Sequence, residues 1–277
     1  MLSKNELEAI KCLQEVCENE GYQLKLNHDM LENRKEGRQD DFFHYEGDTL
    51  VGFLGCYYFG SKVEMCGMVH PDYRRKGIFS FLLKNAVTEA EQRKASKVLL
   101  NAPSSSVSGK DFLRSVACKY AFSEYQMKWH EKELHEIDDV ILRDYDYKKD
   151  QEIEIQLDIQ GFGIEEQDAR EYVETMVENE YDHRFIIEAE GRVAGKIRVS
   201  EVEKEAWIYG FAIFPELRGK GIGRKVLTKV VKMEHQKGLP IFLEVEAKNA
   251  QALTLYESCG FKSYHSQDYY SLLKSES

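Results

Sequence analysis

A glycine-rich turn in the last third of the chain has the composition of an anion-binding site. Three glycines follow one another at alternate positions, just behind an arginine and just before an apolar helical pattern. Glycine lets a backbone approach a ligand closely, and the free N–H groups and the positive dipole end of a helix start attract anions. The turn therefore predicts a site for a phosphate or pyrophosphate. Its residues are Arg218, Gly219, Lys220, Gly221, Ile222, Gly223 and Arg224.

A buried strand and an amphipathic helix must position this turn. Residues 207–214 are apolar and aromatic, and they end at Pro215, which cannot donate to a strand ladder. Behind the turn, apolar residues recur at helical spacing. Two other phosphate-binding motifs fail on spacing, because the P-loop needs a Gly-Lys-Ser/Thr ending and the dinucleotide motif needs glycine or alanine where Val226 stands.

A second segment makes the pattern more specific. Residues 243–246, Leu-Glu-Val-Glu, are followed by Asn249, Tyr256 and then Gly260-Phe261. Together with the Arg-x-x-Gly-x-Gly turn, this order resembles the GCN5-related N-acetyltransferases (GNAT family), and it is similar to the branch that acetylates the N termini of ribosomal proteins. The resemblance implies an α/β protein with a mixed sheet, the acyl-CoA N-acyltransferase fold, and acetyl-CoA as cosubstrate.

The resemblance also implies how acetyl-CoA is held. In this family the strand before the turn splays away from its neighbour, so backbone groups of Phe211, Ala212 and Ile213 would bond the pantetheine arm, and Asn249 would reach it from the last helix. A buried backbone group without a partner costs free energy, so a ligand amide alongside the strand would satisfy it. The N–H of Ile213 would also polarise the thioester carbonyl.

Tyr256 is the candidate acid for the departing thiolate. It follows Asn249 by two helical turns, so both side chains share one face of the helix. A phenol of pKa ~10 that protonates a thiolate of pKa ~8.5 works uphill by roughly 2 kcal/mol. We therefore expect Tyr256 to donate a hydrogen bond first and the proton as the bond breaks.

Glu244 is the candidate base for the amine. Side chains alternate along a strand, so Glu244 faces away from Leu243 and Val245. The resemblance points to Glu244 because it precedes the tyrosine at the spacing of the ribosomal N-terminal enzymes. A glutamate of pKa ~4.3 and an alkylamine of ~10.4 differ by roughly 8 kcal/mol, which the site must reduce or pass through water. Glu205 and Tyr209 on the preceding strand are the alternatives.

Length and composition limit the class of protein. The chain has 277 residues and a net charge of −11, enough for two domains. The acidic balance argues against nucleic acid and is compatible with cationic acceptors, although a surface that only maintains solubility explains it equally well. Six cysteines lack metal or disulfide spacing, and no signal or membrane segment is apparent. We expect a cytoplasmic protein with no metal and no membrane partner.

The glycine turn occurs twice. Residues 70–78, His-Pro-Asp-Tyr-Arg-Arg-Lys-Gly-Ile, match residues 214–222 at a constant offset, and an apolar helix follows each. We predict two tandem GNAT folds, an N-terminal domain at residues 1–135 and a C-terminal domain at residues 136–277. The two copies could pack as family dimers do, so a monomer or a homodimer is expected.

The first copy departs from the motif. Phe79 stands at the position of Gly223, where its side chain would crowd a phosphate, and counting back from the end of the fold places Ala117 at the position of Tyr256. This copy is therefore predicted to be degenerate and without catalysis. Its turn at residues 74–77 could still hold a pyrophosphate, or it is only a solvated basic turn.

The remaining segments predict the elements that complete each copy. In the second copy, the alternation at residues 153–159 fits a strand, whereas the resemblance implies a helix. The expected elements are a helix at 2–20, a loop or short helix at 28–41, a hairpin at 42–58, strands at 62–69, 98–100 and 140–143, a loop at 161–163, a helix at 165–180, and a hairpin at 184–200.

The predicted function is acetyl-CoA dependent N-acetylation of a primary amine, on a small molecule or a peptide or protein, catalysed in the C-terminal domain. The alternative is a tandem module that binds CoA or a partner and catalyses nothing. Tyr256, Asn249 and Glu244 favour the enzyme, because a CoA sensor would not need them. The acceptor pocket is expected within residues 152–182, whose acidic side chains could attract a cation or simply form a solvated helix face.

Overall fold

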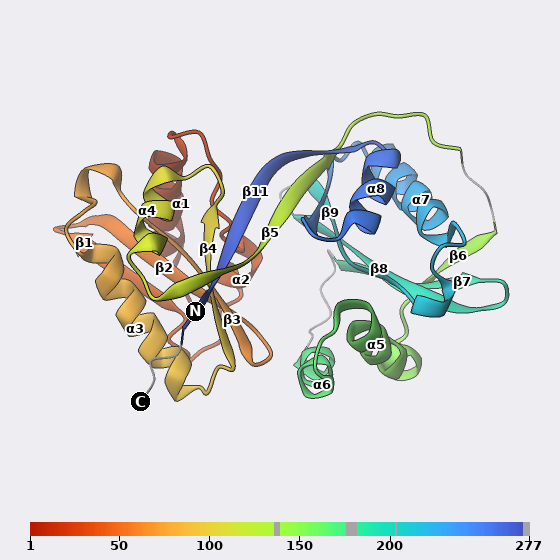
Figure 1. The fold of residues 1–277 in the computed structure, drawn as a ribbon, viewed down its shortest axis with the longest axis horizontal. Helices are drawn as coiled ribbons and strands as arrows, with labels where there is room; N and C mark the ends of the chain where they lie inside the picture. Colours follow the sequence, from red (N-terminus) through yellow and green to blue (C-terminus); the bar gives the residue numbers. More distant parts are fainter. Residues whose placement is uncertain (136–138, 176–181, 203, 274–277) are drawn as a thin grey trace. The chain divides into compact units, whose positions relative to one another are not determined.

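The computed structural model describes residues 1–135, 139–175, 182–202 and 204–273 (Figure 1). The chain divides into two compact units. The first unit contains Met1–Ser123 and His265–Ser277, and the second contains Glu124–Tyr264. Each unit has its own set of strands and its own hydrophobic core.

The first unit begins with helices on one face of its sheet. Ser3 caps the first helix in a capping box, because its side chain accepts from the N–H of Glu6 while the Glu6 carboxylate accepts from the N–H of Ser3. The strands follow in the order β1-β2-β3-β4-β11 across the sheet. The elements are α1 (Lys4–Glu18), α2 (His28–Glu32), β1 (Asp41–Glu46), β2 (Thr49–Phe59), β3 (Lys62–Val69), the 3-10 turn η1 (Pro71–Tyr73), α3 (Ile78–Gln92), β4 (Lys97–Pro103), α4 (Val107–Arg114) and β5 (Cys118–Trp129).

The second unit repeats this order of elements after one additional strand, β6. Its sheet runs β5-β10-β9-β8-β7-β6. The elements are β6 (Val140–Asp144), α5 (Tyr147–Phe162), α6 (Glu166–Thr175), β7 (Asp182–Ala189), β8 (Arg192–Val202), β9 (Glu205–Ile213), the 3-10 turn η2 (Pro215–Leu217), α7 (Ile222–Gln236), β10 (Ile241–Glu246), α8 (Ala250–Ser258) and β11 (Phe261–Leu272).

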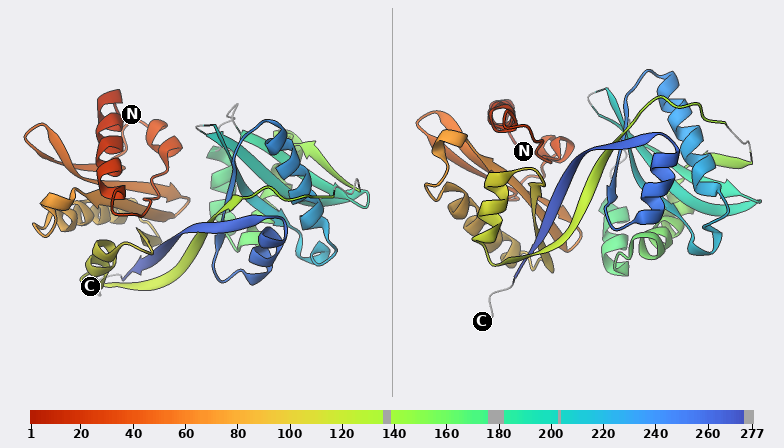
Figure 2. Two further views of the ribbon diagram at one scale, coloured as in Figure 1. Left: turned by 90° about the horizontal axis from the view of Figure 1, so that it is seen from above. Right: turned by 45° about the horizontal axis from the view of Figure 1, so that its top comes forward.

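Helices cover both faces of each sheet (Figures 1 and 2). In the first unit, α1 and α2 pack on one face around Phe53 and Tyr57, and α3 and α4 pack on the other around Val63 and Leu100. In the second unit, α7 and α8 share one core with the strands, and α5 with α6 lies on the opposite face. Each sheet therefore separates a face with the glycine-turn helix from a face with the first helices.

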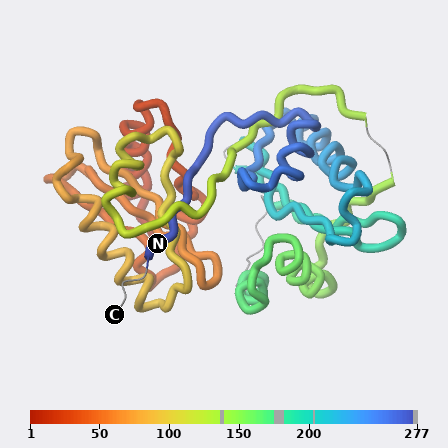
Figure 3. The backbone as a smooth tube through the Cα atoms, viewed as in Figure 1, coloured from red at the N-terminus to blue at the C-terminus, as the bar shows by residue number. Residues whose placement is uncertain are grey.

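The last strand of each sequence half extends into the other unit. Strand β5 pairs with β10 in the second unit, with Glu244 opposite Gln126, and β11 pairs with β4 in the first unit, with Tyr269 opposite Asn101. The tube in Figure 3 shows the chain leaving the first unit through β5 and returning through β11. The expected boundary between residues 135 and 136 therefore does not coincide with the division into compact units.

The predicted internal repeat is confirmed in detail. Helix α3 begins at Ile78 and α7 at Ile222, each behind a glycine N-cap with positive φ. In both units the arginine before the turn binds the last strand residue: Nε of Arg74 donates to the carbonyl of Val69 at 3.0 Å, and Nε of Arg218 donates to that of Ile213 at 2.9 Å. The chain is an α/β protein built from two copies of one fold.

Several predicted elements need correction or completion. Residues 153–159 lie in the helix α5, so the strand interpretation is wrong and the helix implied by the resemblance is right. The loop expected at 161–163 is also wrong, because Gly161 and Phe162 are helical and Gly163 is the C-cap at φ 68°. The segment at 28–41 contains the short helix α2. Of the helix expected at 165–180, the part after residue 175 lies outside the described residues.

Among the residues that the structure describes, no helix combines the length and the apolar character needed to cross a bilayer. All six cysteines are free thiols.

Candidate active site

The two central strands of the second unit separate beside the glycine turn. The parallel pairing of β9 with β10 covers three pairs, from Ala206 opposite Ile241 to Ile208 opposite Leu243. Within the described residues, no pair joins the rest of β9, from Tyr209 to Ile213, to β10. Because the N–H of Phe214 donates to Ala194 on the β8 side, the N–H of Ile213 points to the opposite edge, where the strands separate.

A β-bulge lies in β9 at this point. Lys196 of β8 faces Ala212 and Arg198 faces Tyr209, so Gly210 and Phe211 together lie opposite a single residue. Gly210 has φ 57°, which glycine adopts without strain. The bulge brings Phe211 and Ile213 to the α7 face, where both pack against the core, and Ala212 to the α5 face, where its Cβ lies next to Gly161.

The glycine turn presents an open helix start. Gly219 and Gly221 have φ 78° and 80°, and a Cβ added to either would meet nothing within 4 Å. No side chain caps α7, so its first N–H groups are available to a ligand. Lys220 pairs loosely with Glu190 at 3.8 Å and is exposed, as is Arg224. Ile222 anchors the helix in the core.

The third glycine is tightly packed. A Cβ on Gly223 would lie 3.2 Å from Cδ2 of Leu255 in α8 and 3.7 Å from the ring of Phe211 in β9. The turn, the bulged strand and the last helix therefore meet at this residue. The structure brings together the predicted cofactor residues of β9 and the turn at one end of the sheet.

Tyr256 is buried in the core on the same face as α7. It is 8% exposed, and its ring lies edge-on to Phe261 with the centroids 6.1 Å apart. Burial raises the pKa of the phenol to about 12. Asn249 is the N-cap of the same helix, where its side-chain oxygen accepts from the N–H of Ala252 at 3.1 Å. Its amide N–H₂ group is the part that could donate to a cofactor.

Glu244 lies on the other face of the sheet. Its neighbours Leu243 and Val245 belong to the core that contains Tyr256, so by alternation Glu244 faces the side of α5. One carboxylate oxygen accepts a hydrogen bond from Nε2 of Gln126 at 3.0 Å. The candidate acid and base therefore lie on opposite faces of β10.

The alternative bases belong to an aromatic cluster on this face. Glu205 accepts from the indole N–H of Trp207 at 3.0 Å, and the ring of Tyr209 lies under the guanidinium of Arg198. Trp207 also stacks on Phe242, the strand neighbour of Glu244. Glu205 and Tyr209 are thus already engaged with other side chains.

A buried charge cluster on the α5 face was not predicted. Nζ of Lys196 donates to Asp158 at 2.7 Å and to Glu154 at 3.2 Å, and all three residues are at least nine-tenths buried. Desolvation raises the pKa of Asp158, although Lys196 opposes the shift. Lys196 faces Ala212 across the strands, so the cluster borders the bulge. The helical spacing of Glu154 and Asp158 was the available signal.

The first unit also has an opening, because the parallel pairing of β3 with β4 ends at Met65 opposite Leu100, but it lacks the bulge. Its β2 and β3 pair without a register shift, and Phe79 packs its ring over Gly67 of β3, the counterpart of Phe211. The same ring meets Phe112 edge-on at 4.8 Å. Arg74 of its turn is occupied, since its guanidinium binds Glu20 at 2.8 Å and Tyr22 at 3.3 Å.

The positions of the predicted cofactor residue Asn249 and the predicted acid Tyr256 carry other residues in the first unit. Ser106 caps α4 as Asn249 caps α8, with its hydroxyl accepting from the N–H of Gly109. This cap register places Leu113, a buried core residue, at the position of Tyr256, so the assignment of Ala117 to that position was wrong. The prediction failed because the segment between α4 and β5 cannot be aligned from its composition alone.

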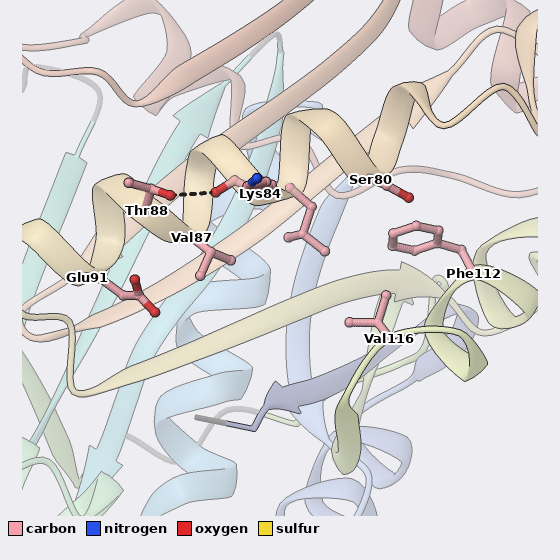
Figure 4. A pocket seen from close by; sticks show the side chains of 8 residues that line it. Ser80, Lys84, Val87, Thr88, Glu91, Phe112 and Val116 are labelled. Carbon is pink, nitrogen blue, oxygen red and sulfur yellow. Dashed lines mark hydrogen bonds between the residues drawn. The ribbon is translucent and has the colours of Figure 1, made fainter. Parts of the chain in front are cut away.

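A shallow groove of about 360 Å³ lies on the first unit, alongside α3 (Figure 4). It contains none of the predicted cofactor positions, and its lining is mainly apolar. The lining residues are Ser80, Leu83, Lys84, Val87, Thr88, Glu91, Phe112 and Val116. In the described part of the chain, no three His, Cys, Asp or Glu side chains gather as metal ligands.

Comparison with known proteins identifies the family. The model of the acetyltransferase (GNAT) family matches residues 7–108 and 125–261, which is most of the chain. The chain therefore belongs to the GNAT family, and the predicted tandem arrangement of two GNAT folds is confirmed.

Relatives agree with this assignment. The [ribosomal protein bS18]-alanine N-acetyltransferase of Escherichia coli (strain K12) is 33% identical over 78 residues, which cover 28% of this chain and 53% of that protein. A mycothiol acetyltransferase of Kocuria rhizophila is 37% identical over 59 residues, 21% of this chain and 20% of that one. The chain spans about half the length of the ribosomal-protein acetyltransferases that it matches.

Solved structures show the same fold over the whole chain. A GCN5-related N-acetyltransferase from Sphaerobacter thermophilus superposes with a TM-score of 0.78 at 16% identity, covering 98% of this chain and 93% of that one. A tandem GNAT protein from the clavulanic acid biosynthesis pathway gives 0.71 at 15% identity, covering 97% and 95%. At these identities the likeness shows the fold.

Proposed function

We propose that the protein transfers the acetyl group of acetyl-CoA to the nitrogen of a primary amine, and that the second unit performs the reaction. The observation that carries this proposal is the opening between β9 and β10, which adjoins an uncapped helix start in the second unit and is accompanied there by a bulge. In the first unit, where β3 and β4 also separate, the ring of Phe79 lies over Gly67 at the corresponding place. We also propose that the half at residues 1–135 is a degenerate copy and that residues 136–277 carry catalysis.

The residues of the turn fit a pyrophosphate. The N–H groups at the start of α7 would hold its oxygens, and Arg218 and Lys220 would neutralise its charge. The positive φ at Gly219 and Gly221 and the open space beside them allow a ligand to approach the backbone. We assign this contact surface to Arg218, Gly219, Lys220, Gly221, Ile222, Gly223 and Arg224.

The bulged strand fits a pantetheine arm. Because β9 leaves β10 after Ile208, the N–H of Ile213 has no strand to pair with in the described residues and would donate to a ligand carbonyl. Phe211, Ala212 and Ile213 supply this edge, and Asn249 would donate its amide from the start of α8. Acetyl-CoA supplies a thioester, whose carbonyl carbon is attacked by the amine.

The side chains then move the protons. The amine loses a proton to Glu244 as its nitrogen bonds to the acetyl carbon, and Tyr256 gives a proton to the sulfur as the carbon–sulfur bond breaks. With the pKa of Tyr256 at about 12, this last transfer is uphill by about 5 kcal/mol relative to a thiol of pKa ~8.5. Tyr256 would therefore act as a hydrogen-bond donor until the bond is nearly broken.

A peptide amine is the first acceptor to test, because the ribosomal-protein relatives are named for the alanine of protein bS18. The full chain would be incubated with acetyl-CoA and either an alanine-initiated peptide with a free α-amine or spermidine. Mass spectrometry would measure the acetylated amine, and a thiol reagent the released CoA. Product from either amine supports the proposal, whereas acetyl-CoA binding without product from both would support the non-catalytic binding module instead.

A further inference from the structure

A residue of the first sequence half lies against the candidate base of the second unit. Gln126 belongs to β5, which joins the sheet of the second unit next to β10, and the register places it directly opposite Glu244. Its Nε2 donates to Glu244 Oε1 at 3.0 Å. The half of the chain without catalytic positions of its own therefore reaches the carboxylate of the other half.

The chemistry of the pair fixes the orientation of the amide. An ionised carboxylate only accepts hydrogen bonds, so Gln126 must present its N–H₂ group to Glu244 and direct its oxygen elsewhere. Gln126 is only 8% exposed, and its amide oxygen is buried and has no hydrogen-bond partner among the described residues. A buried amide that satisfies one end is costly to retain for packing alone.

The equivalent position in the first unit lacks this arrangement. There β11 plays the part of β5, and Tyr269 lies opposite Asn101. The hydroxyl of Tyr269 accepts from Lys25, and no carboxylate stands at the strand position. Of these two equivalent cross-strand positions, the one in the second unit carries an amide–carboxylate pair and the one in the first unit does not.

We infer that Gln126 is a positioning residue of the acceptor site, so that the first half of the chain completes the site of the second. Its N–H₂ group holds the Glu244 carboxylate in one orientation, and its oxygen accepts an N–H from the amine that lies against Glu244. An amine bound at Glu244 would then be held by two acceptors, which leaves its lone pair to be directed at the thioester. This inference rests on the proposed function.

The test compares two variants of Gln126 with a control on the same strand. Gln126→Met keeps the length of the side chain and removes both polar groups, and Gln126→Glu keeps an acceptor but cannot donate when ionised. Lys128→Met alters the exposed residue two positions along the same face, whose ammonium lies over the ring of Phe242. The full chain is used throughout, with acetyl-CoA and the alanine-initiated peptide or spermidine, whichever the wild type acetylates.

We expect both Gln126 variants to lower kcat/KM for the amine at least tenfold, with kcat reduced and KM for the amine raised. In Gln126→Met the affinity for acetyl-CoA, measured by calorimetry, and the Tm should stay close to the wild type. Gln126→Glu should lower the Tm, because it places a second buried carboxylate against Glu244. Lys128→Met should remain within twofold in every constant. Unchanged amine kinetics in Gln126→Met would overturn this inference and leave the proposed function standing. An equal loss in Lys128→Met, or a parallel loss of acetyl-CoA affinity, would also overturn it, since it would indicate a general defect of β5. A wild type that acetylates neither amine would instead refute the proposed function, and the inference with it.

Discussion

In the first unit, the ring of Phe79 lies over Gly67, with Cε2 of Phe79 2.9 Å from the point where a Cβ on Gly67 would stand. In the second unit the large and the small residue are exchanged: the strand carries Phe211 and the helix carries Gly223. An aromatic ring fills the junction in both units, but only in the second does it come from the strand. This leaves the helix start of the second unit free of a bulky side chain, which is the arrangement that a phosphate site requires.

Acetyl-CoA should bind at one site per chain, and the two turn arginines should separate binding from stability. Arg218→Met should weaken binding roughly tenfold, because a charged donor to phosphate is lost. Arg74→Met should leave affinity unchanged and lower the Tm, since Arg74 holds Glu20 and Tyr22 instead. Calorimetry gives stoichiometry and affinity, and thermal melts give Tm. A second site that disappears in Arg74→Met would show that the first turn still holds a pyrophosphate.

The two N-cap glycines offer a matched pair. Gly77 and Gly221 have φ 81° and 80°, and a Cβ on either meets nothing within 4 Å. Alanine at either position should therefore cost a similar amount of stability, about 1 to 2 kcal/mol, from the left-handed backbone alone. Only Gly221→Ala should also weaken acetyl-CoA binding. Denaturant unfolding measures the stability and calorimetry the affinity. An equal loss of affinity in Gly77→Ala would indicate that acetyl-CoA also binds at the turn of the first unit, which contradicts this prediction.

Much of this fold is predictable from sequence because local patterns specify it. The strand at 62–69 and the repeated glycine turn appear where the apolar pattern and the glycines place them. Helix α5 is ambiguous because its apolar residues alternate. Its buried side includes the charged residues Glu154 and Asp158, which a hydrophobic pattern does not count. Gln126 could not be predicted, since its partner Glu244 is set by pairing between strands that lie far apart in the sequence.

Removal of the Tyr256 hydroxyl should affect chemistry more than binding. Tyr256→Phe should lower kcat at least tenfold and leave acetyl-CoA affinity nearly unchanged, because the ring keeps its packing on Phe261. Since burial raises the pKa of Tyr256 to about 12, the phenol stays protonated up to that pH, and a loss of rate between pH 8 and 10 would have another origin. Steady-state kinetics across pH measure both, with the exposed Tyr147→Phe as control. An unchanged kcat would remove Tyr256 from the mechanism.

The buried carboxylates of α5 should respond to pH in opposite directions. Desolvation raises the pKa of Asp158, so the folded state binds its proton more tightly than the unfolded state. The free energy of unfolding therefore loses a contribution as pH rises from about 4 through the raised pKa. Asp158→Asn removes this loss, and its amide oxygen can still accept from Lys196. Relative to wild type, the free energy of unfolding of the variant should therefore be higher at pH 7 than at pH 4.

Asp150 provides the matched control with the reverse sign. Its carboxylate accepts two hydrogen bonds from the Arg143 guanidinium, at 2.8 Å each, which holds its pKa below the usual value. That stabilisation is present at neutral pH and is lost as pH falls through the lowered pKa, so Asp150→Asn should cost more at pH 7 than at pH 4. Urea unfolding of both variants and the wild type at the two pH values measures the differences. If both variants shift in the same direction, the charge of Asp158 is compensated in the folded protein more completely than its burial beside Lys196 implies.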